Sequence, residues 1–144
     1  MEIWQHTVIS AIITAVLWPF FSWWSLLVLV GGVLIDSDHV LWYYYRRGDF
    51  NLRKVYSYCR AISDNKDTKE YKKAVLIFHS YEALVVLAVL SFFIPQFVLL
   101  LIGVIEHMLS DFLYTLYKWR GPYSLVVFRK SAIVFLYDFF TKIL

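Results

Sequence analysis

The sequence predicts an all-α protein in which about four transmembrane helices form two hairpins, within a single membrane domain that covers residues 1–144. First, 60% of the 144 residues are hydrophobic and 17% are charged, whereas soluble domains are about 45–50% apolar and about 25% charged. Second, no Asp, Glu, Lys or Arg lies between Glu2 and Asp36, and no Lys or Arg lies between Lys73 and Lys118. Basic residues outside apolar blocks are typical of membrane insertion. A nucleic-acid-binding face, which would spread them over a folded surface, is excluded.

Residues 1–45 are predicted to form the first hairpin. As one helix, the apolar block Ile3–Ile35 would be about 50 Å long, but the hydrocarbon core of a bilayer is only about 30 Å thick. Pro19 lies midway along this block, and proline disfavours a helix at the residue before it. We therefore expect one helix over about 2–18 and a second over about 21–45. A single proline-kinked helix is the alternative.

Residues 46–73 carry nine of the 14 basic residues. By the positive-inside rule we expect this segment on the cytoplasmic side of the membrane. Apolar residues recur in it at helical spacing, which predicts an amphipathic surface helix. These residues are Leu52, Val55, Tyr56, Cys59 and Ile62.

Residues 74–118 are predicted to form the second hairpin, with its turn at Pro95-Gln96. Each side has about 20 residues, which is enough for one span. The apolar runs of residues 119–144 are too short to span, so we expect an interfacial tail there. Membrane lipids are the predicted partners. The sequence leaves the oligomeric state open.

Histidine and acidic residues inside or at the ends of the apolar blocks are the candidate metal ligands. They are His6, Asp36, Asp38, His39, His79, His107 and Asp111. Asp36 and His39 have the spacing that puts two side chains on one helix face, as do His107 and Asp111. Counted from the two prolines at the turns, five of these ligands return to about the same level, about 9–15 Å below the basic edge. They are His6, Asp36, His79, His107 and Asp111. The sequence therefore predicts one layer of histidine and acid.

The acids of this layer need neutralising cations. No Lys or Arg is expected at their depth, so protons or metal ions must balance their charge. Histidine and carboxylate together suit zinc, manganese or iron. Because these ligands are too many for one tetrahedral zinc ion, we expect two or more divalent metal ions, with zinc preferred. A polar core that shares protons and holds the bundle together is the alternative.

The order of these motifs resembles a known family. His6 is followed by Asp36-Ser37-Asp38-His39, by His79-Ser80, and by Gly103-x-x-x-His107-x-x-x-Asp111. Over most of residues 1–117 this pattern resembles the inner-membrane metal-dependent hydrolase family, the YdjM-like proteins. The sequence departs from the family at Ile35, where the family usually has proline, and at 74–78, where it usually has an Arg and a Thr. The resemblance implies metal-dependent hydrolysis, and the His-x-x-x-Asp pattern is similar to that of zinc phospholipases.

We therefore expect a membrane-embedded hydrolase whose metal ions activate a water molecule that attacks a phosphoester. The depth of the layer favours a phospholipid or a lipid phosphate, which would enter from the cytoplasmic leaflet. Glu82, at helical spacing from His79, and Glu106 are the candidate general bases or further ligands. The alternatives are a transporter for protons or divalent metal ions and a non-catalytic membrane protein with a structural metal or polar layer.

Overall fold

The computed structural model describes residues 3–65 and 76–119, and these residues form helices and turns without a β-strand. In chain order the elements are α1 (Ile3–Phe21), the short 3-10 helix η1 (Ser22–Ser25), α2 (Leu26–Leu34), α3 (Ser37–Arg47), α4 (Leu52–Asp64), α6 (Tyr81–Phe93) and α7 (Phe97–Trp119). The predicted all-α class is confirmed. The predicted interfacial tail, apart from Trp119, and the lysine-rich end of the basic segment lie outside the described residues.

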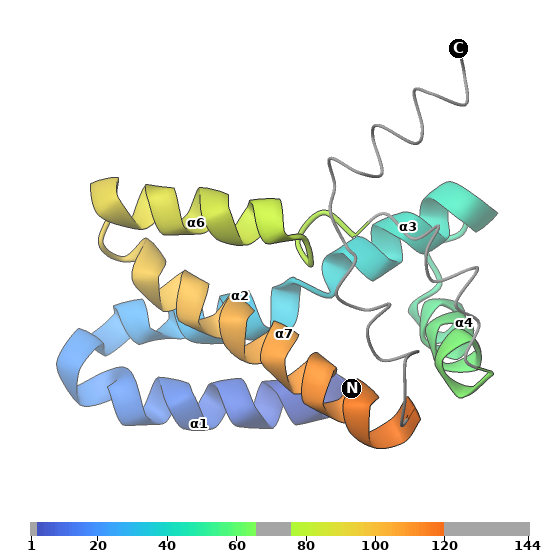
Figure 1. The fold of residues 1–144 in the computed structure, drawn as a ribbon, viewed down its shortest axis with the longest axis horizontal. Coiled ribbons are helices and arrows are strands. Elements are labelled where there is room, and N and C mark those ends of the chain that lie inside the picture. Colours follow the sequence, from blue (N-terminus) through green and yellow to red (C-terminus); the bar gives the residue numbers. More distant parts are fainter. Residues whose placement is uncertain (1–2, 66–75, 120–144) are drawn as a thin grey trace, which may run out of the picture.

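Residues 3–34 form two helices joined by a tight turn. Helix α1 continues through Pro19 and ends at Phe21, three residues later than expected, because a proline in the last turn disturbs only the end of the hydrogen-bond ladder. The chain turns at Ser22, a non-glycine residue with a φ of 48°. Helices α1 and α2 then run side by side in opposite directions (Figure 1). A single kinked helix is therefore excluded.

The predicted helix over about 21–45 is wrong in one respect, because it breaks at Ile35-Asp36. Helix α2 ends at Leu34, and α3 begins at Ser37. Across the break the backbone N–H groups bond to carbonyls three residues back, as in His39 N to Asp36 O at 3.1 Å. Asp and Ser side chains compete with helical backbone bonds, and three of them occur here in succession. The break leaves Asp36 between two helices and puts Asp38 in the first turn of α3.

Residues 81–119 also form two helices joined by a turn, but the first of these helices is short. Its turn lies at Pro95, where the N–H of Phe97 bonds to the carbonyl of Ile94 at 2.9 Å. Helix α6 begins only at Tyr81, because the hydroxyl of Ser80 accepts the N–H of Ala83 at 3.2 Å and caps it. Its 13 residues are about 20 Å long. This length is less than the thickness of the hydrocarbon core, about 30 Å.

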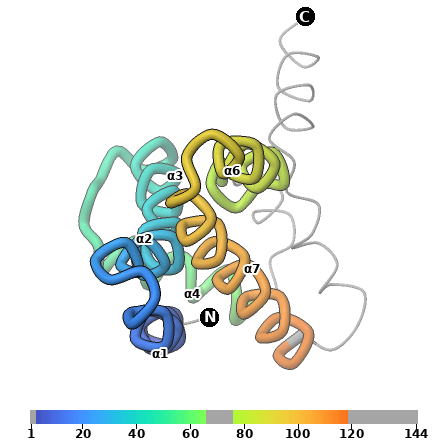
Figure 2. The backbone as a smooth tube through the Cα atoms, turned by 90° about the vertical axis from the view of Figure 1, so that its left-hand side faces the viewer, coloured from blue at the N-terminus to red at the C-terminus, as the bar shows by residue number. Residues whose placement is uncertain are grey.

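Helices α2 and α7 make the most extensive helix contact, because glycines let their backbones meet. A Cβ atom at Gly103 would overlap the carbonyl oxygen of Val28 and lie 2.8 Å from the nitrogen of Gly32. A Cβ atom at Gly31 would overlap the carbonyl oxygen of Leu100. Small residues permit such close approach between apolar helices. In the end-on view, α2 and α7 lie between α1 and α6 (Figure 2).

Two helical stretches are long and apolar enough to cross a membrane, namely Ile3–Arg47, taken across its turn, and Phe97–Lys118. Only 17% and 22% of their most apolar windows are buried, so most of this surface faces outward, as at Ile12 and Val16. The core helix of a soluble protein would be mostly buried. The predicted count of four spans is not confirmed.

Both hairpin turns lie at one end of the bundle, on the left in Figure 1, and α3, α4 and the end of α7 lie at the other. The predicted surface helix is α4. Its N–H groups are capped by Asn51, and Val55 is its buried residue. The other end of α4 is held against α7 by an ion pair of 2.6 Å between Asp64 and Lys118.

Candidate metal centre

The seven predicted ligands lie together at the end of the bundle that carries α3 and α4. His6 comes from α1, Asp36 from the break between α2 and α3, Asp38 and His39 from the first turn of α3, His79 from the turn before α6, and His107 and Asp111 from α7. They form three overlapping groups in which one ligand atom from each residue lies within 4.8 Å of the others. The groups are His6-His107-Asp111, Asp36-His79-His107 and Asp38-His39-His79. The predicted clustering of histidine and acid is confirmed.

The central group has the spacing of metal ligands. Nε2 of His79 lies 3.1 Å from Nε2 of His107. Oδ1 of Asp36 lies 3.6 Å from the first nitrogen and 3.5 Å from the second. Ligand atoms placed about 2.0–2.1 Å from a tetrahedral zinc ion would lie about 3.3–3.4 Å apart. The three atoms therefore fit one divalent ion, and nitrogen and carboxylate oxygen are donors that zinc, manganese and iron accept.

Hydrogen bonds on the far side of each ring determine which nitrogen carries the proton. Nδ1 of His107 lies 2.8 Å from the carbonyl oxygen of Gly32, so it must donate. Nδ1 of His79 donates to Oδ2 of Asp38 at 3.0 Å, and the N–H of Phe78 donates to the same oxygen at 3.2 Å. The two Nε2 atoms are left with lone pairs that face each other, which requires a proton or a metal ion between them. Partners that orient histidine in this way typically accompany metal ligands.

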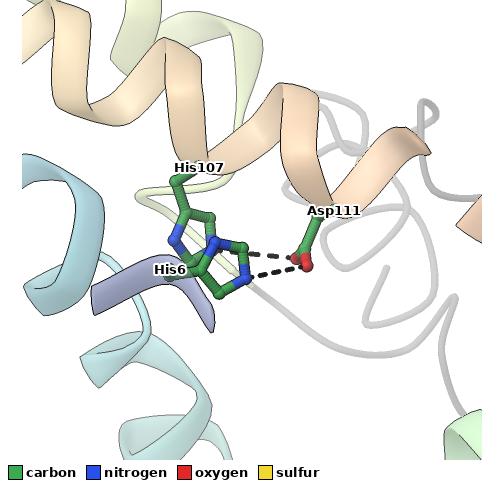
Figure 3. A group of neighbouring side chains, drawn as sticks. All are labelled: His6, His107 and Asp111. Carbon is green, nitrogen blue, oxygen red and sulfur yellow. Dashed lines mark hydrogen bonds and ion pairs between the residues drawn. The ribbon is translucent and has the colours of Figure 1, made fainter. Parts of the chain in front are cut away.

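His6 and Asp111 form a pair beside the central group (Figure 3). Nε2 of His6 lies 3.1 Å from Oδ1 of Asp111. The ring of His6 stacks on that of His107, with centroids 3.8 Å apart and an interplanar angle of 16°. The other carboxylate oxygen of Asp111 lies 3.7 Å from Nε2 of His107. Asp111 would therefore offer a bound ion one carboxylate oxygen on the side of each histidine.

His39 stands at the outer side of the cluster, where a quarter of its side chain is exposed. Its Nε2 lies 3.6 Å from Oδ1 of Asp36, so three histidine Nε2 atoms surround that oxygen. Its Nδ1 lies 4.0 Å from the Sγ of Cys59 on α4. Asp38 belongs to the same group, and its Oδ1 is buried without a hydrogen-bond partner among the described residues.

The three groups cannot each hold an ion with a complete set of ligands, because they share histidines. His107 and His79 each belong to two groups, but each has one nitrogen committed to Gly32 or Asp38. An ion in the central group therefore uses the free nitrogen of both. His6 with Asp111 is left for a second ion, while Asp38 is left as the orienting partner of His79.

The two candidate general bases are not brought into this cluster. Glu106, which directly precedes His107 in α7, is buried and accepts the hydroxyls of Ser10 at 2.7 Å and Ser110 at 3.0 Å. Glu82 lies in the first turn of α6 and belongs to none of the three groups formed by the described residues. The expected helical pairing of Glu82 with His79 is wrong, because His79 precedes the helix.

Sequence reasoning missed three contributors to the site. They are the carbonyl of Gly32, the N–H of Phe78 and the thiol of Cys59. Gly31-Gly32 signals close helix packing, and such packing exposes a carbonyl to the neighbouring helix. The other two depend on contacts between segments far apart in the chain, for which no local pattern exists.

Comparison of the chain with protein-family models, with curated proteins and with solved structures gave no significant match. The function is therefore argued from the cluster itself.

Proposed function

We propose that this protein is a membrane-embedded, metal-dependent hydrolase that cleaves a phosphoester in a phospholipid or lipid phosphate. One observation carries the proposal, namely the convergence of Oδ1 of Asp36 and Nε2 of His79 and His107 at 3.1–3.6 Å. Its setting among apolar helices supports a lipid substrate. The order of motifs that resembles the YdjM-like hydrolases points to the same chemistry.

The residues of the chain would hold and orient the ion. Asp36, His79 and His107 bind it, while Gly32 and Asp38 keep the two rings in place. A bound divalent ion lowers the pKa of a coordinated water towards about 7 and offsets charge on phosphate oxygens. His107 is fully buried, whereas about a fifth of the Asp36 side chain is exposed. Substrate would therefore approach from the side of Asp36, which matches the open position that catalytic metal sites keep.

The depth of the cluster favours a substrate that lies in the membrane. The 15 residues from His6 to Phe21 in α1 span about 22 Å, and α6, which follows His79 closely, spans about 20 Å. If the hairpin turns reach the far side of a core about 30 Å thick, the cluster lies about 10 Å below the near boundary. This depth assumes the four-span bundle, in which the basic α3–α4 end lies on the cytoplasmic side of the inner membrane.

Lipid hydrolysis in reconstituted vesicles tests the proposal. Wild-type protein loaded with Zn²⁺ or Mn²⁺ should release phosphate or a phosphorylated headgroup from phospholipid or phosphatidic acid, and EDTA should stop the release. In His107→Ala the rate of lipid hydrolysis should fall by more than about 100-fold. Loss of a hydrogen-bond partner of a metal ligand costs up to that factor, and loss of the ligand itself should cost more. Asp49→Asn, which removes an exposed carboxylate outside the cluster, is the matched control. Wild-type turnover in His107→Ala, or no turnover of any of these lipids by the loaded protein, would count against the hydrolase.

One observation favours a second candidate, a transporter of protons or divalent ions. Buried polar residues continue along α1 from His6 to Ser10 and Thr14, and Glu106 lies beside Ser10. Polar groups within a membrane often line an ion pathway. Flux of Zn²⁺ or protons through the same vesicles, without lipid turnover, would favour this candidate.

A further inference from the structure

We propose that Glu106 is a positioning residue, which holds α1 against α7 so that His6 meets His107 and Asp111, and that it does not act on substrate. That this packing also supports metal binding rests on the proposed function. The packing role stands on the contacts of Glu106 alone.

Both carboxylate oxygens of Glu106 are engaged by hydroxyl groups. Oε2 accepts the hydroxyl of Ser10 at 2.7 Å, and Oε1 accepts that of Ser110 at 3.0 Å. Ser10 is fully buried and Glu106 is 9% exposed. A buried carboxylate is costly unless its oxygens accept hydrogen bonds. The bond to Ser10 is therefore a strong tie between α1 and α7 in apolar surroundings.

The positions of these residues in the chain connect this tie to the cluster. His6 lies four residues before Ser10, so both are on one face of α1, one turn apart. His107 directly follows Glu106, and Asp111 directly follows Ser110. Fixing Ser10 against Glu106 therefore fixes the height and rotation at which His6 faces α7. A rotation of α7 by one residue, about 100°, would separate the stacked rings.

Gly32 of α2 brings a third helix to the same point. A Cβ atom there would overlap the hydroxyl of Ser10 and lie 3.0 Å from Oε2 of Glu106. The glycine therefore leaves room for the Ser10–Glu106 bond, while its carbonyl orients His107 at 2.8 Å. Contacts of Glu106 and Gly32 together place His6 and His107, whose ring centroids are 3.8 Å apart.

Nitrogen-15 NMR of the histidine rings tests the inference directly. The chain has four histidines, so selective labelling gives a spectrum of four rings. In chelator-treated protein, Glu106→Ala should shift the ring signals of His6 and His107 and leave those of His39 in place. Glu106→Gln, whose amide oxygen still accepts the Ser10 hydroxyl, should restore the wild-type positions. Glu82→Ala is the matched control, because it removes an acid of α6 outside the cluster.

An unchanged four-ring spectrum in Glu106→Ala, or an equal change in Glu82→Ala, would overturn the inference. If Glu106→Ala does not fold, Ser10→Ala and Ser110→Ala each remove one of the two hydrogen bonds. These variants should shift His6 and His107 by smaller amounts, and unchanged signals in both would overturn the inference as well. The spectra are recorded without metal. A wild-type protein that binds no ion would therefore contradict the proposed function but not the positioning role of Glu106.

Discussion

Replacing Gly103 with alanine should lower the free energy of unfolding by at least about 2 kcal/mol. On an open helix face the same change would raise stability by about 1 kcal/mol, because alanine is the better helix former. Here the added Cβ meets the backbone of Val28 and lies 2.8 Å from the nitrogen of Gly32, and backbone atoms cannot move aside as a side chain can. Helix α2 must therefore shift away from α7.

The shift should also reach the cluster, because Gly32 carries the carbonyl that orients His107. We expect a lower midpoint of thermal unfolding in detergent, together with weaker metal binding. Ala11→Val adds methyl groups at an exposed position of α1 and serves as the control, with little change in either measurement. A Gly103→Ala protein as stable as wild type would contradict the close packing of α2 and α7.

Replacing Asp38 with asparagine should weaken metal binding by about 10–100-fold while leaving the number of bound ions unchanged. Oδ2 of Asp38 accepts both Nδ1 of His79 and the N–H of Phe78. Neutral asparagine orients the His79 ring less strongly, so Nε2 of His79 becomes a weaker metal ligand. Loss of such a hydrogen-bond partner typically lowers metal affinity by about 10–100-fold. Competition between the protein and a chelating dye measures the affinity.

The number of ions separates the two roles open to Asp38. If it is a ligand, as the sequence predicted, Asp38→Asn should lose one equivalent of metal. If it only orients His79, the equivalents stay constant and the affinity falls. Asp49→Asn again controls for loss of one negative charge. Unchanged affinity and unchanged metal content in Asp38→Asn would contradict both roles.

The layer of histidine and acid could be predicted because it follows from regular geometry. Helices rise by a constant amount per residue, and Pro19 and Pro95 mark turns at one end of the bundle. Counting residues from each proline therefore brings His6, Asp36 and His107 to one level. The two turns between the apolar helices follow from the same local signals of spacing and composition.

The details of the site could not be predicted, because they depend on contacts between distant segments. Asp38 and His79 are 41 residues apart in the chain, and nothing local shows that the first orients the second. The helical pairing of His79 with Glu82 fails because the Ser80 cap starts α6 after the histidine. The late start of α6 is also why this segment is shorter than the predicted span.

Glu106 shows a third limit of sequence reasoning. Its neighbour His107 faces the cluster, and a rotation of about 100° per residue indicates that Glu106 faces elsewhere. The sequence does not show what it meets there. Only the packing of α1 against α7 brings Ser10 to it, so a residue that the sequence offers as a general base becomes a contact between helices.

The metal content of the purified protein tests the central claim most directly. Wild-type protein and a His79→Ala, His107→Ala double variant are compared by plasma mass spectrometry, with the helical content of both checked by circular dichroism. The account predicts two equivalents of zinc, manganese or iron in wild type, with at least the ion bound by Asp36, His79 and His107 lost in the variant. Well-folded wild type that holds no metal after incubation with these ions would contradict it, and the cluster would then be a polar core that shares protons.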